Sequence, residues 1–136
     1  MTLLNPWLPV ALLALTQGLA GCVSAPEAQG PAPQSLSAEL HPGPAPKAPD
    51  HCIGALQDGA TYRWFSALCH DDLTSDMTTM LQRALAARGI YTATPNGRYD
   101  TRTEAAVLAY QSARDLPSPT LSTRAAQQMG LIPWLD

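Results

Sequence analysis

Hydrophobic residues recur at helical spacing in the C-terminal part of the chain. Their positions there are three or four residues apart: Met77, Leu81, Ala84 and Leu85. Thr74 or Ser75 can cap the start of such a helix, and Gly89 can adopt the left-handed conformation that ends one. The pattern therefore predicts a first helix that ends at Gly89.

Two further helices follow from capping signals and spacing. The segment Thr101-Arg102-Thr103-Glu104 has the form of a capping box that opens a helix. The predicted buried stripe of this second helix is Thr103, Ala106, Val107 and Tyr110. Before it, Thr94-Pro95-Asn96-Gly97 is a turn that needs the left-handed tolerance of Asn and Gly. A third, short helix is expected to begin at Ser122 and end at Gly130.

The region before the helices has the pattern of a strand. Residues 60–68 are rich in aromatic residues and alternate in polarity, and the turn signal Asp58-Gly59 precedes them. We expect a small hairpin or loop in front of the helical domain.

The N-terminus has the pattern of an export signal. The apolar run from Leu8 to Leu15 is too short to span a bilayer, which needs roughly 20 residues. Leu19-Ala20-Gly21-Cys22 follows it and resembles the bacterial lipobox, although no Lys or Arg lies among the first seven residues. The resemblance implies a signal peptide at 1–21 and lipid attachment at Cys22, with more than one acyl chain, palmitate among them. Val23 follows instead of the Asp typical of inner-membrane retention, so we expect the outer membrane, facing the periplasm.

Residues 22–50 form a linker by composition. Pro, Ala, Ser and Gly dominate them, and such a segment has too few large apolar residues to offset its ordering entropy. At about 3 Å per residue it could reach on the order of 80 Å. We expect this segment to be disordered and extended, with His41 solvated.

Cys52 and Cys69 remain as an even pair once Cys22 carries lipid. In an oxidising compartment a disulfide is the simplest interpretation, and closing this loop would add about 3 kcal/mol. Two alternatives use the adjacent histidines, His51 and His70. One is a Cys2His2 zinc site, against which the spacing of adjacent ligands argues. The other is a Cys52 nucleophile with a histidine base, for which the foldable part, roughly 85 residues, is too small.

Composition and charge exclude some classes of function. The net charge is −3, and no cluster of basic residues forms a nucleic-acid footprint. With a single Phe and abundant Ala and Leu, any core favours closely packed helices. The expected fold class is mainly α. The expected division of the chain is a signal peptide at 1–21, a linker at 22–50, a disulfide-stapled extension at 51–72 and a helical domain at 73–136.

The helical part resembles the peptidoglycan-binding domain family of small three-helix modules. The matching pieces are Leu81-Gln82, Leu85, Gly89-Ile90-Tyr91, Asn96-Gly97, residues 103–111, Leu116, Leu121-Ser122-Thr123 and Met129-Gly130-Leu131. Arg98-Tyr99-Asp100 and Pro117-Ser118-Pro119 depart from the family pattern in two loops. The resemblance implies a non-catalytic module that binds peptidoglycan, and a protein–protein module of an envelope complex is the alternative on the same fold.

A ligand site is expected in the loop before the second helix. Peptidoglycan presents carboxylates, amides and sugar faces, and Arg98, Tyr99 and Arg102, with Tyr91 nearby, offer guanidinium and aromatic groups for them. We expect Gln111 to be structural, with its amide bonded to loop backbone. The scattered Asp and Glu form no catalytic constellation, so we expect no enzymatic activity, cofactor or metal. The expected partners are peptidoglycan, a membrane through the lipid and an envelope protein.

Overall fold

The first helix begins where a threonine side chain caps it. The computed structural model describes residues 34–47 and 49–134, and in it α1 spans Ser75–Ala86. The side chain of Thr74 accepts a hydrogen bond from the Met77 amide at 3.2 Å, which satisfies one free donor of the first turn. Gly89, with φ of +70°, follows the helix end. Both predicted boundary signals are confirmed.

The second helix, α2 at Thr101–Ser112, has a different cap from the one predicted. Asp100 is the N-cap, and its carboxylate accepts hydrogen bonds from the amides of Arg102 and Thr103 at 3.1 Å each. Thr101 is the first helical residue and is exposed, so the capping box expected at Thr101 and Glu104 is wrong. A carboxylate one residue earlier satisfies the same donors and carries a charge that the helix N-terminus stabilises.

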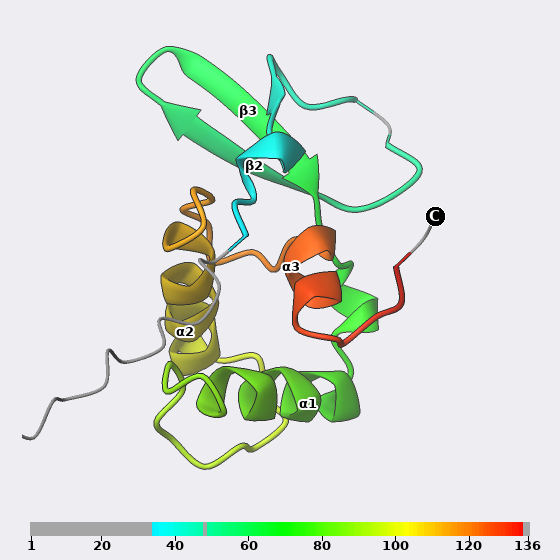
Figure 1. The fold of residues 1–136 in the computed structure, drawn as a ribbon. Coiled ribbons are helices and arrows are strands. Elements are labelled where there is room, and N and C mark those ends of the chain that lie inside the picture. Colours follow the sequence, from blue (N-terminus) through cyan, green and yellow to red (C-terminus); the bar gives the residue numbers. More distant parts are fainter. Residues whose placement is uncertain (1–33, 48, 135–136) are drawn as a thin grey trace, which may run out of the picture. The chain divides into compact units, whose positions relative to one another are not determined.

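The third helix and the core follow the predicted pattern. Helix α3 spans Thr123–Gln128, with Ser122 as its N-cap and Gly130 following it at φ +76°. Phe65, Leu81, Leu85, Val107, Leu116 and Leu121 are fully or almost fully buried in one cluster. The three α-helices lie to one side of the strands in Figure 1. This core therefore joins the helical part to the region before it.

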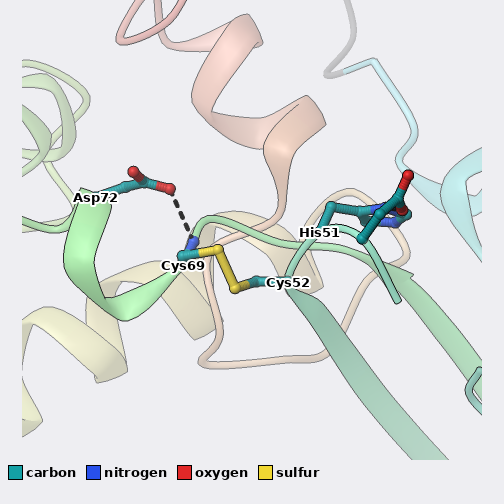
Figure 2. The surroundings of a disulfide bond; sticks show 5 residues. His51, Cys52, Cys69 and Asp72 are labelled. Atoms are coloured by element: carbon teal, nitrogen blue, oxygen red, sulfur yellow. Dashed lines mark hydrogen bonds and ion pairs between the residues drawn. A yellow bond between two sulfur atoms is a disulfide. The ribbon is translucent and has the colours of Figure 1, made fainter. Parts of the chain in front are cut away.

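The predicted hairpin is present and the disulfide staples its base. Strands β2 at Ile53–Asp58 and β3 at Thr61–Ser66 pair in antiparallel register across the Gly59-Ala60 turn. Cys52 and Cys69 form a disulfide with their Cα atoms 5.1 Å apart (Figure 2). Both thiols are thereby used, so the zinc and nucleophile alternatives for this pair are wrong. Gly54 lies opposite Phe65, and a Cβ there would lie 2.1 Å from the ring, so only glycine fits.

A short segment inside the expected linker is ordered against the domain. Residues 34–43, called here the docked segment, contain a 3-10 helix, η1 at Ser37–Glu39, and strand β1 at His41–Pro42. Strand β1 pairs with β3, which gives a three-stranded sheet in the order β1-β3-β2. Leu36 is fully buried in the core, and Glu39 forms an ion pair with Arg124 of α3 at 2.8 Å.

These contacts correct two expectations about the linker. Disorder over residues 22–50 does not describe the docked segment, because burial of Leu36 and pairing of β1 provide contacts that composition cannot reveal. His41 is not merely solvated, since its ring stacks on Trp64 with the centroids 4.2 Å apart. The residues at 22–33, with Cys22, and the expected signal peptide at 1–21 lie outside the described residues.

The described residues belong to one compact unit, residues 31–136. A second 3-10 helix, η2 at His70–Asp72, connects β3 to α1. Within the described part, the mainly α expectation holds only for the C-terminal helices, since a three-stranded sheet packs with them. No helix among these residues is both long and apolar enough to cross a bilayer.

Candidate functional site

The loop before α2 is held by one buried glutamine of α1. The amide oxygen of Gln82 accepts hydrogen bonds from the backbone amides of Asn96 and Gly97 at 2.7 and 3.0 Å. Its amide nitrogen lies 2.9 to 3.0 Å from the side-chain oxygens of Asn96 and Thr103 and the carbonyl of Arg98. This role of Gln82 was not predicted; the signal that could have indicated it is a polar side chain next to the apolar stripe of a helix. This one side chain fixes the loop that carries the expected ligand residues.

Gly97 allows the loop to approach α1 closely. Its φ is +69°, and a Cβ at this position would lie 2.4 Å from Ser75 Oγ and 2.9 Å from the Ser75 carbonyl. The predicted need for glycine in this turn is confirmed, for reasons of both conformation and space. The loop then leads to Asp100, where the hydrogen bond from the Thr103 amide, opposed by desolvation and aided by further hydrogen bonds from Asn96, Thr103 and Arg102, holds the carboxyl pKa below its usual value.

A groove lies between the residues after α1 and one face of α2. Ile90, Tyr91, Thr92 and Ala93 form one side, and Arg102, Ala105, Ala106 and Ala109 form the other. Its volume is about 280 Å³, and we call it the alanine groove. The small alanine side chains leave room beside the helix, so an extended chain could lie close to its backbone.

Arg102 is the charged residue of this groove. Its side chain is exposed and has no ion-pair partner among the residues that the structure describes. A guanidinium presents several N–H donors in a planar fork that matches a carboxylate. The lining residues include no carboxylate, so the positive charge of Arg102 suits the groove to binding an anion.

Tyr91 lies beside Arg102 in the groove but is mostly buried. It is only 4% exposed and belongs to the hydrophobic core. Its hydroxyl has no hydrogen-bond partner in the described part of the chain. The ring therefore supports the groove from below and does not offer the free aromatic face expected for a sugar.

Tyr99 lies away from Arg102, in a second cavity. Its hydroxyl donates to the Pro119 carbonyl at 2.9 Å, and burial, with a smaller contribution from the negative charge of Glu104, raises its pKa. Glu104 lines the same cavity, which lies where the extension meets the helical domain. At 100° per residue, Glu104 points to the side of α2 opposite Arg102, so α2 separates the two cavities.

Arg98 is exposed on the loop, and its carbonyl is bound by the side chains of Gln82 and Thr103. It lines neither cavity described above. The structure therefore brings Tyr91 and Arg102 together and places Tyr99 and Arg98 elsewhere. Arg98, Tyr99 and Arg102 were expected to form one site because they are close in sequence. In the structure they lie in different places, because the loop ends and α2 begins between Tyr99 and Arg102.

Gln111 has the structural role that was predicted for it. Its amide nitrogen donates to the carbonyls of Ser118 and Thr120 at 2.7 and 2.8 Å, and its oxygen accepts from the Ser122 amide at 2.8 Å. Gln82 and Gln111 thus bind the backbone of the loops that follow α1 and α2. These loops have no regular secondary structure, so two buried side-chain amides form hydrogen bonds with backbone groups that a helix or strand would otherwise pair.

The helices and the two loops held by buried glutamines define a small helical module with grooves beside α2. Residues 74–120 match the family model described as "Putative peptidoglycan binding domain". This match covers α1, α2 and the loop between them, and it supports a peptidoglycan-binding domain in this part of the chain. No curated protein and no solved structure matches the chain.

Proposed function

We propose that the chain is a non-catalytic lipoprotein that binds peptidoglycan through the alanine groove and tethers itself to the cell wall. The observation that carries the proposal is the family match over residues 74–120 together with the groove of that region, where the Arg102 guanidinium has no ion-pair partner within residues 34–47 and 49–134. The match makes peptidoglycan the expected ligand, and the groove offers a place where its charged groups could bind.

The chemistry of the groove fits the carboxylates of a peptidoglycan stem peptide. Arg102 can form a charge-assisted, bidentate hydrogen-bonded pair with a carboxylate, while the alanines of α2 leave space for the adjoining peptide. Thr92 and Ala93, on the other side of the groove, belong to a stretch without helix or strand. A bound peptide in extended conformation could form hydrogen bonds with the backbone groups of these two residues.

Two observations favour a binding role without catalysis. Cys52 and Cys69, outside the groove, are joined in a disulfide and so offer no free thiolate. The groove itself is lined by apolar residues, Tyr91, Thr92 and Arg102, and this lining offers no carboxylate or imidazole as a general base. These features support a role in localisation, in which a wall-bound module holds the rest of the molecule near peptidoglycan.

The anchor is proposed at Cys22, in the outer membrane and facing the periplasm. We expect metabolic labelling with an alkyne analogue of palmitate to mark the full chain when it is produced in a bacterium. A Cys22→Ala variant should lose the label, because the lipobox Leu19-Ala20-Gly21-Cys22 offers a single acceptor thiol. Label that persists in the variant, or that never attaches to the natural chain, would contradict the anchor while leaving wall binding open.

Wall binding is tested by co-sedimentation of the full chain with purified sacculi. We expect saturable binding that weakens about tenfold in an Arg102→Ala variant, since a charge-assisted pair of an exposed guanidinium contributes on the order of 1.4 kcal/mol. Arg83→Ala is the matched control, because Arg83 is exposed on α1 and lines neither cavity. It removes the same charge and should bind as the natural chain does.

The outcomes of this experiment test wall binding and the position of the binding site separately. Binding that is equal in Arg102→Ala and Arg83→Ala would keep the function and reject the alanine groove. No sedimentation of the natural chain would reject wall binding and favour the alternative, a protein–protein module of an envelope complex. Co-purification of an envelope protein without sacculi would then support that alternative.

A further inference from the structure

A second cavity, of about 340 Å³, lies at the junction of the stapled extension and the helical domain. We call it the junction cavity. The extension contributes Cys52, Ile53, Leu68 and Cys69, followed by His70 and Leu73. The helical domain contributes Tyr99, Glu104, Pro119, Thr120 and Leu121. Because half of the wall comes from residues before position 74, this cavity is not a property of residues 74–120 alone.

We propose that the junction cavity binds a primary ammonium group on a short aliphatic chain, with Glu104 as the counter-ion. In peptidoglycan this group is the side-chain amine of the diamino acid in a stem peptide. The identity of that ligand rests on the proposed function, whereas the ammonium chemistry follows from the cavity itself.

The charge of the cavity favours a cation. Glu104 is the only carboxylate in its wall, and the wall includes no Lys or Arg. Asp72 accepts a hydrogen bond from the Cys69 backbone amide at 3.3 Å and is a second carboxylate near the disulfide, although it does not line the cavity (Figure 2). Arg102, two residues before Glu104 and so about half a turn from it, points to the opposite side of α2. The carboxylate of Glu104 therefore favours a cation in this cavity, whereas Arg102 favours an anion in the alanine groove.

The rest of the wall suits the chain that carries the ammonium group. The disulfide and the side chains of Ile53, Leu73 and Leu121 form an apolar surface for methylene groups. An ammonium group has three donors and needs acceptors in addition to the carboxylate. Pro119 offers its carbonyl, which accepts the Tyr99 hydroxyl and keeps a second lone pair. One carboxylate, the Pro119 carbonyl and an apolar wall together suit an alkylammonium rather than a metal ion or an anion.

The opposite charges of the two cavities suit the two kinds of charged group on a stem peptide. The alanine groove offers Arg102 to a carboxylate, and the junction cavity offers Glu104 to an amine. Since α2 separates these residues, each group is bound independently. Loss of the interaction at Arg102 should therefore weaken binding without abolishing the interaction at Glu104. The same should hold for Arg102 when the interaction at Glu104 is lost.

The test compares two peptides that differ only at the amine. The full chain, labelled with 15N, is titrated with N-acetyl-L-Ala-γ-D-Glu-L-Lys and with the form that is also acetylated at Nε of lysine, and the dissociation constants are obtained by NMR. We expect acetylation to weaken binding about tenfold and shifts for the free amine to centre on Glu104 and Leu121. Glu104→Gln should bind both peptides with the lower affinity. Asp58→Asn, which removes an exposed carboxylate at the tip of the β2-β3 hairpin, is the control and should retain the difference.

The outcomes distinguish this inference from the proposed function. Equal affinity for the two peptides, or a Glu104→Gln variant that still prefers the free amine, overturns the ammonium site even if sacculi are bound. Amine-dependent binding at Glu104 supports the site even if sacculi are not bound, and in that case only the wall ligand is rejected. Arg102→Ala should weaken both peptides by the same factor, which separates the carboxylate interaction from the amine interaction.

Discussion

A Gln82→Leu variant is expected to lose about 4 kcal/mol of unfolding free energy, which is a large effect for a single substitution. Gln82 is fully buried, and leucine would leave the amides of Asn96 and Gly97 without the acceptor that they have now. It would also remove a donor to the Arg98 carbonyl. Each buried polar group left without a partner costs about 1 to 3 kcal/mol. Urea unfolding followed by circular dichroism gives the free energy.

Two further variants define the cause of this effect. Gln57→Leu makes the same change at an exposed position of β2 and should alter stability by less than about 0.5 kcal/mol. Gln82→Glu keeps the oxygens that accept from the loop and removes the amide donors, so it should also be destabilised. If the unfolding free energy of Gln82→Leu lies within about 1 kcal/mol of that of the natural chain, the loop is held by contacts other than this amide.

Removal of the disulfide in a Cys52→Ala, Cys69→Ala double variant is expected to lower unfolding free energy by about 3 kcal/mol in the chain-entropy model. The two cysteines are 17 positions apart, and the closed loop restricts the unfolded chain. The loss should affect the helices as well as the hairpin, because Phe65 of β3 is buried in the same core as Leu121. Urea unfolding of the natural chain and of the double variant, measured by circular dichroism and by tryptophan fluorescence, gives the unfolding free energy of each protein.

Reduction of the natural chain is the control for this second prediction. A reductant should lower its stability to about that of the double variant and should leave the variant itself unchanged. A hairpin that unfolds while the helices keep their full stability would show that the extension and the helical domain are not one cooperative unit. In that case the wall of the junction cavity could separate without unfolding α2.

Several elements could be predicted because short sequence signals determine them. Thr74 and Ser122 cap α1 and α3, and Gly97 allows the tight turn between α1 and α2. The Asp58-Gly59 signal also predicted the turn of the hairpin. In each case the stabilising interaction lies within a few residues of the signal, so no knowledge of the tertiary structure is needed.

Other features could not be predicted, because they depend on partners distant in the chain. Leu36 lies in a short stretch rich in Pro, Ala and Ser with too few large apolar residues to predict a core contact, yet its amide donates to the Arg114 carbonyl at 2.7 Å and its side chain enters the core. Asp100 and Thr101 are both good N-cap residues, and spacing alone did not choose between them. In the structure the Asp100 carboxylate accepts from the amides of Arg102 and Thr103, so Asp100 opens α2.

The residues of the candidate site stay a prediction, and the structure does not bring them together as one cluster. Arg98, Tyr99 and Arg102 are near neighbours in sequence, but α2 begins between the last two and turns their side chains to different sides. The structural role of Gln111 was predicted, while that of Gln82 was missed. The negative junction cavity could not be predicted either, because it requires Cys69 and Glu104 to come together from separate elements.

The docked segment changes how far an anchored molecule could reach. If Cys22 carries the lipid, only residues 22–33 lie between the anchor and the ordered chain at Gln34. Even fully extended, those residues span at most about 40 Å, half of the 80 Å expected for a linker that continues to residue 50. Halving the radius reduces the volume that the module can explore about eightfold and raises its effective concentration at nearby wall by the same factor. Weak binding in each cavity would then suffice to keep the molecule on the peptidoglycan closest to its membrane.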